Sequence, residues 1–145
     1  MQWHTSPFAT VYSRAYDGVS SPVNYRAIVA TSGRASQNVG DWVCKYGRTT
    51  GYGCGTIVSK DVIGDGSGAG NTGPMSATFI QVHQDNVLLS FHGDSGGPWF
   101  TGNTALGLMH AFADVPNGRD AFYMAVDYIQ STGLNVLVNC PATGC

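Results

Sequence analysis

The sequence predicts an all-β fold, an antiparallel sandwich or barrel closed by a C-terminal helix. First, the 145 residues contain short runs rich in β-branched and aromatic side chains, separated by turn residues. Second, Asp17-Gly18, Gly102-Asn103 and Asn117-Gly118 are turn formers, because glycine and asparagine tolerate positive φ. Third, only residues 121–133 have helical periodicity, and Gly133 ends them. The length fits one domain, and no repeat or linker divides it.

The predicted strands follow one another with a turn-forming segment after each. In order, they are ATVYSR, NYRAIVAT, DWVCKYG, GYGCGTIVSK, ATFIQVH, NVLLSFH, GPWF and TALGLMHAF, within residues 9–112. The segment GDGSGAGN at 64–71 has the glycine content of a phosphate-binding loop. It lacks both the GxGxxG and the GxxxxGK[ST] spacing, and no helix pattern follows it, so we expect a surface loop.

Composition and charge exclude several classes of function. Charged residues make up 11% of the chain, the net charge is −2, and the lysines and arginines are scattered, so we expect no nucleic-acid partner. No apolar run is long enough to span a bilayer, so we expect no membrane partner. The amino end, MQWHTSPFATVYSR, lacks the apolar core and cleavage site of a secretion signal. Either a signal was removed upstream, or Met1 is an internal or engineered start.

The four cysteines indicate an exported protein. Cys44 and Cys54 flank a glycine-rich turn, which suits a disulfide that closes a hairpin-like loop. Zinc binding is less favoured, because neither CxxC spacing nor a histidine pair accompanies them. A disulfide predicts a secreted, extracellular protein. Cys140 and Cys145 could pair with each other or with something outside this chain. We expect no metal and no cofactor.

The stretch HGDSGGPWF, residues 92–100, contains the candidate nucleophile Ser95. A nucleophilic serine needs an exposed hydroxyl, a base and donors for the oxyanion, and flanking glycines let successive N–H groups face one point. A tight turn in which Asp94 caps local N–H groups explains the same letters, and turn chemistry alone does not decide. The G-x-S-x-G elbow of α/β-hydrolases is rejected, because Pro98 and a strand follow where that fold needs a helix.

Two motifs carry a resemblance to a known family. GDSGGPWF resembles the nucleophile motif of chymotrypsin-type serine proteases, and VCKYGRTTGYGCGTI resembles the disulfide loop of the bacterial streptogrisin and α-lytic protease group. With GLMHAF and the C-terminal helix, the resemblance covers nearly the whole chain. It implies that residues 1–145 form the second of the family's two barrels, a six-stranded antiparallel Greek-key barrel. Residues 1–20 would be the interbarrel link and the strand that enters the barrel, and the N-terminal barrel would be absent.

The resemblance also implies roles for individual residues. Ser95 matches the nucleophile, and the N–H groups of Gly93 and Ser95 match the oxyanion hole. Cys44 and Cys54 match a family disulfide. Asp94 matches a buried carboxylate whose cationic partner in the bacterial branch is the residue after the first loop cysteine, here Lys45. A buried carboxylate without such a partner would cost several kcal/mol.

The expected substrate pocket departs from the family. SFHGD, residues 90–94, holds no cysteine, so the second cysteine pair that commonly braces the pocket is absent. The residues expected at the pocket are Leu89, His92, His110, Ala111 and Phe112. Phe112 would narrow the mouth, and Leu89, near the base, offers no acid for a basic side chain. We therefore expect a small or apolar substrate residue rather than Arg or Lys.

None of the four histidines is assigned as the base by the resemblance. In the family, the histidine and the aspartate come from the first barrel, which here would lie upstream of Met1. His4 is expected on a strand or in the interbarrel link, His83 on a strand, and His92 in contact with substrate. His110 borders the cleft, where a structural hydrogen bond is favoured over a role as surrogate base. The isolated chain is then expected to be nearly inert. A companion N-terminal barrel fragment, or a second copy of the chain, would cover the exposed barrel face.

Three functional hypotheses follow from these residues. The first is a serine endopeptidase that forms an acyl-enzyme at Ser95 on a protein or peptide substrate, with the histidine and aspartate supplied by the missing barrel. The alternative is a catalytically inactive protease-like domain that binds protein or peptide. The third is a complete hydrolase that uses His110 as its base.

Overall fold

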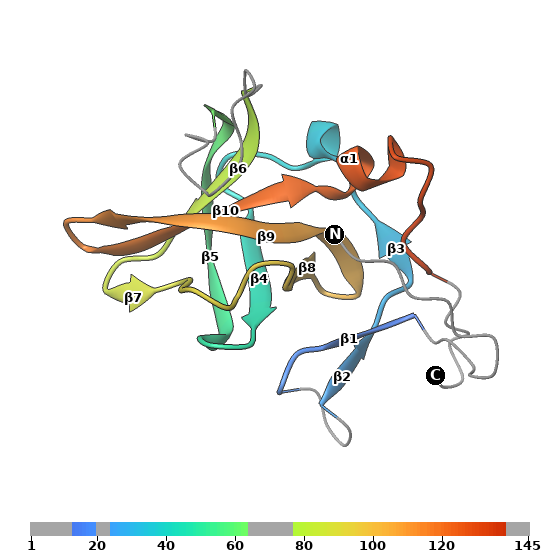
Figure 1. Cartoon of the computed structure of the whole chain (residues 1–145), viewed down its shortest axis with the longest axis horizontal. Helices are drawn as coiled ribbons and strands as arrows, with labels where there is room; N and C mark the ends of the chain where they lie inside the picture. The colour runs from blue at the N-terminus through green and yellow to red at the C-terminus, as the bar shows by residue number, and fades with distance from the viewer. Residues whose placement is uncertain (1–12, 20–23, 64–76, 139–145) are drawn as a thin grey trace.

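The computed structural model describes residues 13–19, 24–63 and 77–138. The described part is built almost wholly from short strands, and Figure 1 shows their arrangement. The elements are β1 (Arg14–Tyr16), β2 (Tyr25–Ala27), β3 (Ala30–Thr31), the 3-10 helix η1 (Arg34–Ser36), β4 (Trp42–Gly47), β5 (Gly51–Ile63), β6 (Ala77–His83), β7 (Val87–Leu88), β8 (Pro98–Thr101), β9 (Thr104–Val115), β10 (Gly118–Ala125) and α1 (Val126–Gln130).

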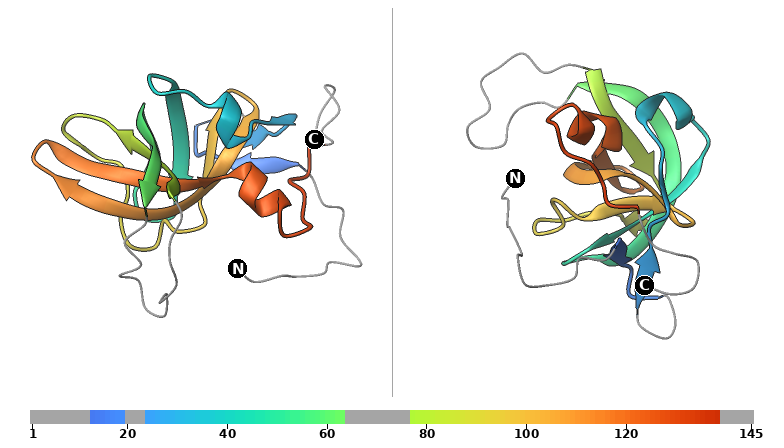
Figure 2. Two further views of the ribbon diagram at one scale, coloured as in Figure 1. Left: turned by 90° about the horizontal axis from the view of Figure 1, so that it is seen from above. Right: turned by 90° about the vertical axis from the view of Figure 1, so that its right-hand side faces the viewer.

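Six of these strands close into a barrel. The order around the ring is β9-β8-β4-β5-β6-β10, and the ring closes because β10 also pairs with β9. Every neighbouring pair in the ring is antiparallel. β3 and β7 add parallel pairings to β9 and β10, whereas β1 and β2 form a separate hairpin beside the barrel (Figures 1 and 2). The predicted six-stranded antiparallel barrel is confirmed.

The connection from β6 to β8 determines where the candidate site lies. β6 pairs with β5 and β10, whereas β8, the next barrel strand in the chain, pairs with β4 and β9. Residues 84–97 therefore cross from one side of the barrel to the other, as in a Greek key. This crossing contains β7, which lies beneath the β9–β10 hairpin in Figure 1, and the turn that contains Ser95.

The barrel core explains why the predicted helix is shorter than expected. In β10, Ala121, Tyr123 and Ala125 are fully buried, whereas the residues between them are partly exposed, which is the period of two of a strand. The first part of the predicted helix, residues 121–125, is therefore strand, and α1 covers only Val126–Gln130. The apolar residues at 122 and 125 fit one face of a helix, whereas those at 121, 123 and 125 have the period of a strand, so the sequence pattern was ambiguous.

Tyr123 and Trp99 stack at the centre of this core, with ring centroids 4.8 Å apart. Both side chains are fully buried, and each polar end has a partner. The Tyr123 hydroxyl donates to Gln37 Oε1, and the Trp99 indole N–H points to Met109 Sδ, 3.3 Å away. Burial raises the pKa of Tyr123 above its usual value, so the hydroxyl stays protonated.

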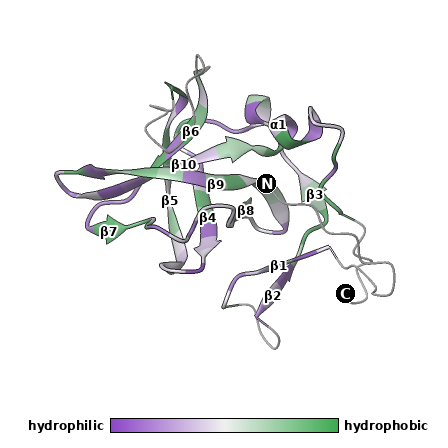
Figure 3. Ribbon diagram, viewed as in Figure 1, coloured by the Kyte–Doolittle hydropathy of each residue, from purple (hydrophilic) through white to green (hydrophobic). Residues whose placement is uncertain are grey.

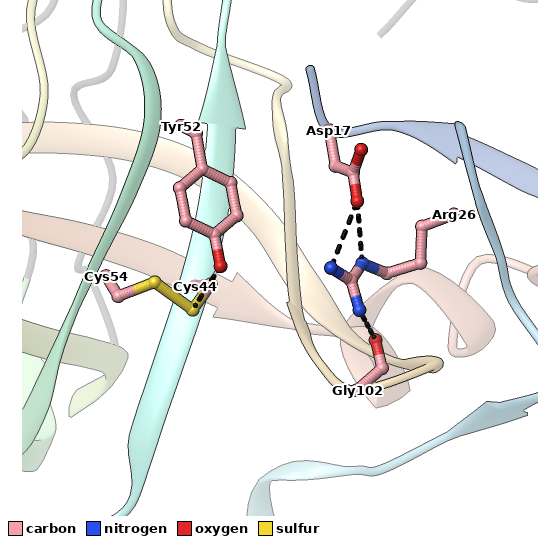
Figure 4. The surroundings of a disulfide bond; sticks show 6 residues. All are labelled: Asp17, Arg26, Cys44, Tyr52, Cys54 and Gly102. Atoms are coloured by element: carbon pink, nitrogen blue, oxygen red, sulfur yellow. Dashed lines mark hydrogen bonds and ion pairs between the residues drawn. A yellow bond between two sulfur atoms is a disulfide. The ribbon is translucent and has the colours of Figure 1, made fainter. Parts of the chain in front are cut away.

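The predicted disulfide between Cys44 and Cys54 is present (Figure 4). The two residues face each other directly on β4 and β5, so the bond crosslinks adjacent strands. Nearby, Arg26 pairs with buried Asp17 at 3.0 Å and donates to the Gly102 carbonyl at 2.8 Å, which ties the β1–β2 hairpin to the β8–β9 turn (Figure 4).

Several sequence predictions fall outside the described residues. These are the surface loop at 64–71, the pairing of Cys140 and Cys145, and the strand position of His4. Of the predicted strand at 86–92, only Val87 and Leu88 are strand. No helix in the described ranges is long and apolar enough to cross a membrane.

Candidate active site

Ser95 lies at an exposed, sharply bent turn at the end of the crossing segment. Gly93 and Gly96 on either side of it have φ of +98° and +83°, which side chains other than glycine rarely adopt. The Asp94 amide donates to the Phe91 carbonyl at 3.1 Å, which closes the first bend. The glycines are thus required by the backbone at this position.

Strand β9 holds the turn in place. The Gly96 amide donates to the Met109 carbonyl at 2.9 Å, and the Met109 amide donates to the Gly97 carbonyl at 2.8 Å. The Ser95 hydroxyl donates to the His110 carbonyl at 3.3 Å. Residues 109–112 of β9 therefore run directly beside the candidate nucleophile.

His110 occupies a bulge in β9. Met109 pairs with Tyr123 and Ala111 pairs with Phe122, so His110 is an extra residue without a partner on β10. Its ring stacks on Phe79 of β6, with centroids 4.5 Å apart. The carbonyl of His110 faces Ser95, whereas its ring packs on β6, two strands away in the ring.

The amides of Gly93 and Ser95 donate to no group in the part of the chain that the structure describes. The Thr49 hydroxyl donates to the His92 carbonyl at 2.7 Å. Because that carbonyl and the Gly93 N–H belong to one planar trans peptide, fixing the oxygen also fixes the N–H on the opposite side. A Cβ at position 93 would lie 2.5 Å from Thr49 Oγ1, so the position also lacks space for a side chain.

Asp94 is 1% exposed and accepts four hydrogen bonds. Its Oδ1 accepts from the amides of Thr49 and Thr50 at 2.7 and 3.1 Å. Its Oδ2 accepts from the Thr50 hydroxyl at 2.6 Å and from the Phe91 amide at 3.0 Å. Burial by itself would raise the pKa of Asp94, but these hydrogen bonds outweigh burial and hold it below its usual value.

Lys45 is the cation nearest to Asp94 and is equally buried, at 1% exposure. Its Nζ lies 3.8 Å from Asp94 Oδ2 and donates to the Gly51 carbonyl at 2.9 Å. It also donates to the Thr50 hydroxyl, which in turn donates to Asp94. Burial lowers the pKa of Lys45, and the Asp94 charge acts in the opposite direction. The structure thus brings the two predicted partners together, with Thr50 bridging them.

The structure does not gather all the residues expected at the pocket in one place. Leu89 is 1% exposed and belongs to the barrel core. His92 and Phe112 meet edge to face, with centroids 5.1 Å apart. His110, Ala111 and Phe112 line a cavity together with Phe79 of β6 and Phe122 of β10. A role for any of them in substrate binding stays a prediction.

His83 has partners of its own, away from Ser95. Its Nδ1 lies 2.5 Å from Asp120 Oδ1 on β10, and its Nε2 lies 3.1 Å from Asp85 Oδ1. The hydrogen bond to Asp120 and then that to Asp85 raise the pKa of His83. In the described residues, no histidine ring nitrogen bonds to the Ser95 hydroxyl.

The sequence analysis missed three residues that contact the site. Thr49 and Thr50 lie in an ordinary turn, RTTGY, and no local signal distinguishes them. Arg119 has its guanidinium over the rings of Phe91 and Phe112. One sequence feature could have drawn attention to Arg119, because it is the only lysine or arginine after residue 60. In the described ranges, no group of three or more His, Cys, Asp or Glu residues is arranged to hold a metal ion.

Solved structures with similar folds are serine proteases. A glutamic acid-specific serine protease that uses a histidine triad in substrate binding is 20% identical, with a TM-score of 0.69 over 91% of this chain and 64% of its own. Thermobifida fusca protease A is 23% identical, with a TM-score of 0.67 over 88% of this chain and 62% of its own. Cellulomonas bogoriensis chymotrypsin is 22% identical, with a TM-score of 0.71 over 93% of this chain and 67% of its own.

These comparisons show the fold of the chain. It is the fold of bacterial chymotrypsin-like serine proteases, as the sequence motifs implied. This chain spans less than two thirds of the length of the first two structures. No protein-family model matches it.

Proposed function

We propose that this chain is the nucleophile-bearing barrel of a serine endopeptidase. The observation that supports this most is the exposed Ser95 hydroxyl, which shares its turn with two amides, of Gly93 and Ser95, that have no protein acceptor in the described residues. Preorganised N–H donors of this kind stabilise the negative charge that develops in acyl transfer.

In the proposed reaction, Ser95 Oγ attacks the carbonyl carbon of a peptide bond and its proton passes to a base. The carbonyl oxygen becomes an oxyanion that accepts from the two amides. The base then protonates the leaving amine, which gives an acyl-enzyme at Ser95 that water hydrolyses. Asp94 does not touch the reacting atoms. Its four hydrogen bonds hold the turn that positions Ser95 and the amides.

The base is proposed to come from outside the described residues, from an N-terminal barrel with a histidine and an aspartate. Losing the serine–histidine partnership costs about a million-fold in turnover. About a thousand-fold over water remains from the oxyanion hole and binding. The isolated chain is therefore expected to be nearly inactive. The catalytic site would then be complete only when that barrel is present, because the barrel brings the histidine to the oxyanion hole and the bound substrate.

A second candidate function is a non-catalytic module that binds protein or peptide along β9. It is favoured by two histidine rings that do not bond to the Ser95 hydroxyl. The His110 ring packs on Phe79, and the His83 ring bonds to the carboxylates of Asp120 and Asp85. The Cys44–Cys54 disulfide fits an exported protein under either function, which is why we propose a secreted location.

A fluorophosphonate probe separates the candidates. We expect the chain alone to label slowly, and labelling to rise strongly when an N-terminal barrel with a histidine–aspartate pair is supplied. Mass spectrometry should locate the adduct on Ser95, with Ser95→Ala as the unreactive control. Failure to label under both conditions would contradict the protease proposal and favour the binding module. Loss of labelling in His110→Ala, with the fold retained, would instead favour His110 as the base.

A further inference from the structure

We propose that Arg119 makes the pocket beside Ser95 selective for an acidic substrate side chain. This inference rests on the proposed function, because it takes the carbonyl next to that side chain to lie at the amides of Gly93 and Ser95. It replaces the small or apolar residue that the sequence favoured.

The position of the pocket follows from the backbone around Ser95. Residues 89–92 lead into the Ser95 turn, and residues 109–112 of β9 run beside it through the bonds of Met109 and His110. Under the proposed function, we place the side chain of the substrate residue whose carbonyl lies at the two amides against these two segments. Phe91 and Phe112 face each other there, with centroids 5.8 Å apart and planes 19° from parallel.

The guanidinium of Arg119 reaches the same place from β10. Its central carbon lies 4.8 Å from the centre of the Phe91 ring and 4.4 Å from the centre of the Phe112 ring. Its Nη1 lies 3.4 Å from the Ser90 carbonyl. β7 pairs with the start of β10, Leu88 opposite Arg119, which keeps this arginine against the 89–92 segment. Arg119 thus contacts both aromatic rings and places a positive charge beside them.

The donors of Arg119 are only partly used. Its Nε donates to Asp114 Oδ1 at 2.6 Å, and its Nη2 donates to no group in the described part of the chain. The Arg119 side chain is 12% exposed, whereas that of Asp114 is 72% exposed. A solvated carboxylate therefore holds one edge of a largely buried guanidinium. A substrate carboxylate in the pocket can accept from Nη2 or take the place of Asp114.

The chemistry favours an acid over the other classes of side chain. A lysine or arginine would meet a like charge, and an apolar side chain would cover the free N–H groups without supplying an acceptor. A carboxylate supplies both the opposite charge and oxygens that match the planar guanidinium. Because no other lysine or arginine follows residue 60, Arg119 is the only candidate of its kind in this half of the chain.

The test uses two peptide amides that are isosteric, acetyl-Ala-Ala-Pro-Glu-amide and acetyl-Ala-Ala-Pro-Gln-amide, titrated into the isotopically labelled chain and followed by NMR. We expect the glutamate peptide to bind about tenfold more tightly or better, as for hydrogen bonds to a charged group. Arg119→Gln should reduce the ratio to about one by the same reasoning. Arg34→Gln is the matched control, because Arg34 also pairs with an exposed carboxylate, Asp61, and should leave the ratio unchanged.

Asp114→Asn keeps the test informative if Arg119→Gln fails to fold. Removing the competing carboxylate should increase the preference for glutamate, whereas an arginine that only braces the two aromatic rings would leave it unchanged. Equal affinities for the two peptides, or no measurable binding of either, would overturn the proposal.

Fluorophosphonate labelling of the same samples distinguishes this failure from failure of the proposed function. A glutamate preference that survives in Ser95→Ala, with no labelling of the unaltered chain either alone or with the N-terminal barrel supplied, would support the acidic pocket and contradict catalysis. Labelling of Ser95 without any glutamate preference would support catalysis and contradict the acidic pocket.

Discussion

Replacing Lys45 by methionine should destabilise the barrel more than any other change of a single surface or core cation. Methionine has a similar length, so the packing around Leu89 and Gly53 is largely kept. The charge opposite Asp94 is lost, while the carboxylate stays 1% exposed. Removing one partner of a buried ion pair leaves the other charge buried without compensation, and this strongly lowers the free energy of unfolding.

The geometry gives the size of the effect. At 3.8 Å between Lys45 Nζ and Asp94 Oδ2, and an effective dielectric constant of about 20, the attraction is about 4 kcal/mol. Removing the lysine also relieves its own desolvation, and Asp94 keeps its four hydrogen bonds. We therefore expect Lys45→Met to lower the free energy of unfolding by about 3 kcal/mol.

Urea unfolding, followed by tryptophan fluorescence, measures this change at pH 7. Lys60→Met is the control, because Lys60 is the only other lysine and its change should fall within about 0.5 kcal/mol. The effect of Lys45→Met should be much smaller in an Asp94→Asn background, as a double-mutant cycle requires. A loss below about 1 kcal/mol, equal in both backgrounds, would refute the reasoning about a coupled buried pair.

Two further predictions concern other parts of the barrel. The pKa of His83 is raised above 6.5, so its contacts with Asp120 and Asp85 stabilise the fold at pH values below 6.5, and that stability is lost as the pH rises through the raised value. Urea titrations from pH 6 upward should show this decline in the unaltered chain, and an equal decline in His83→Gln would contradict it. The Cys44–Cys54 bond closes a loop with a separation of 10 residues, so Cys44→Ala/Cys54→Ala should lose about 3 kcal/mol at 25 °C in the chain-entropy description. Thermal unfolding with and without a reductant checks this, and a double variant as stable as the oxidised chain would refute it.

The fold could be predicted from the sequence because its signals are local. Runs of β-branched and aromatic residues mark β4, β5, β6, β8 and β9, and the turn dipeptides mark the ends of the hairpins. Ring closure could not be derived in this way, because the pairing of β6 with β10 and of β4 with β8 joins segments that are distant in sequence. The helix was overextended because the spacing of Phe122 and Ala125 fits one face of a helix, whereas the buried alternate residues Ala121, Tyr123 and Ala125 form a strand.

The candidate site was predictable where one short motif carries it. Ser95, Gly93 and Asp94 are adjacent in sequence, and Lys45 was reached through the cysteine loop. The sequence did not predict the roles of Thr49, Thr50 and Arg119. Their contacts with the site form only where the crossing segment, residues 84–97, meets the β4–β5 turn and the β9–β10 hairpin. Figure 3 shows the tip of that hairpin as hydrophilic ribbon, a pattern that by itself is typical of any surface turn.

The groups that orient Ser95 all belong to the barrel itself. Thr49 and Thr50 come from the β4–β5 turn, and the carbonyls of Met109 and His110 come from β9. None of these groups lies before β4, so the geometry of the Ser95 turn does not depend on an added barrel, whereas under the proposed function the base would come from one. Stability and reactivity should therefore separate. A change at Asp94 or Lys45 should reduce both the free energy of unfolding and the labelling of Ser95. Omission of the supplied barrel should reduce the labelling alone and leave the free energy of unfolding of this chain unchanged.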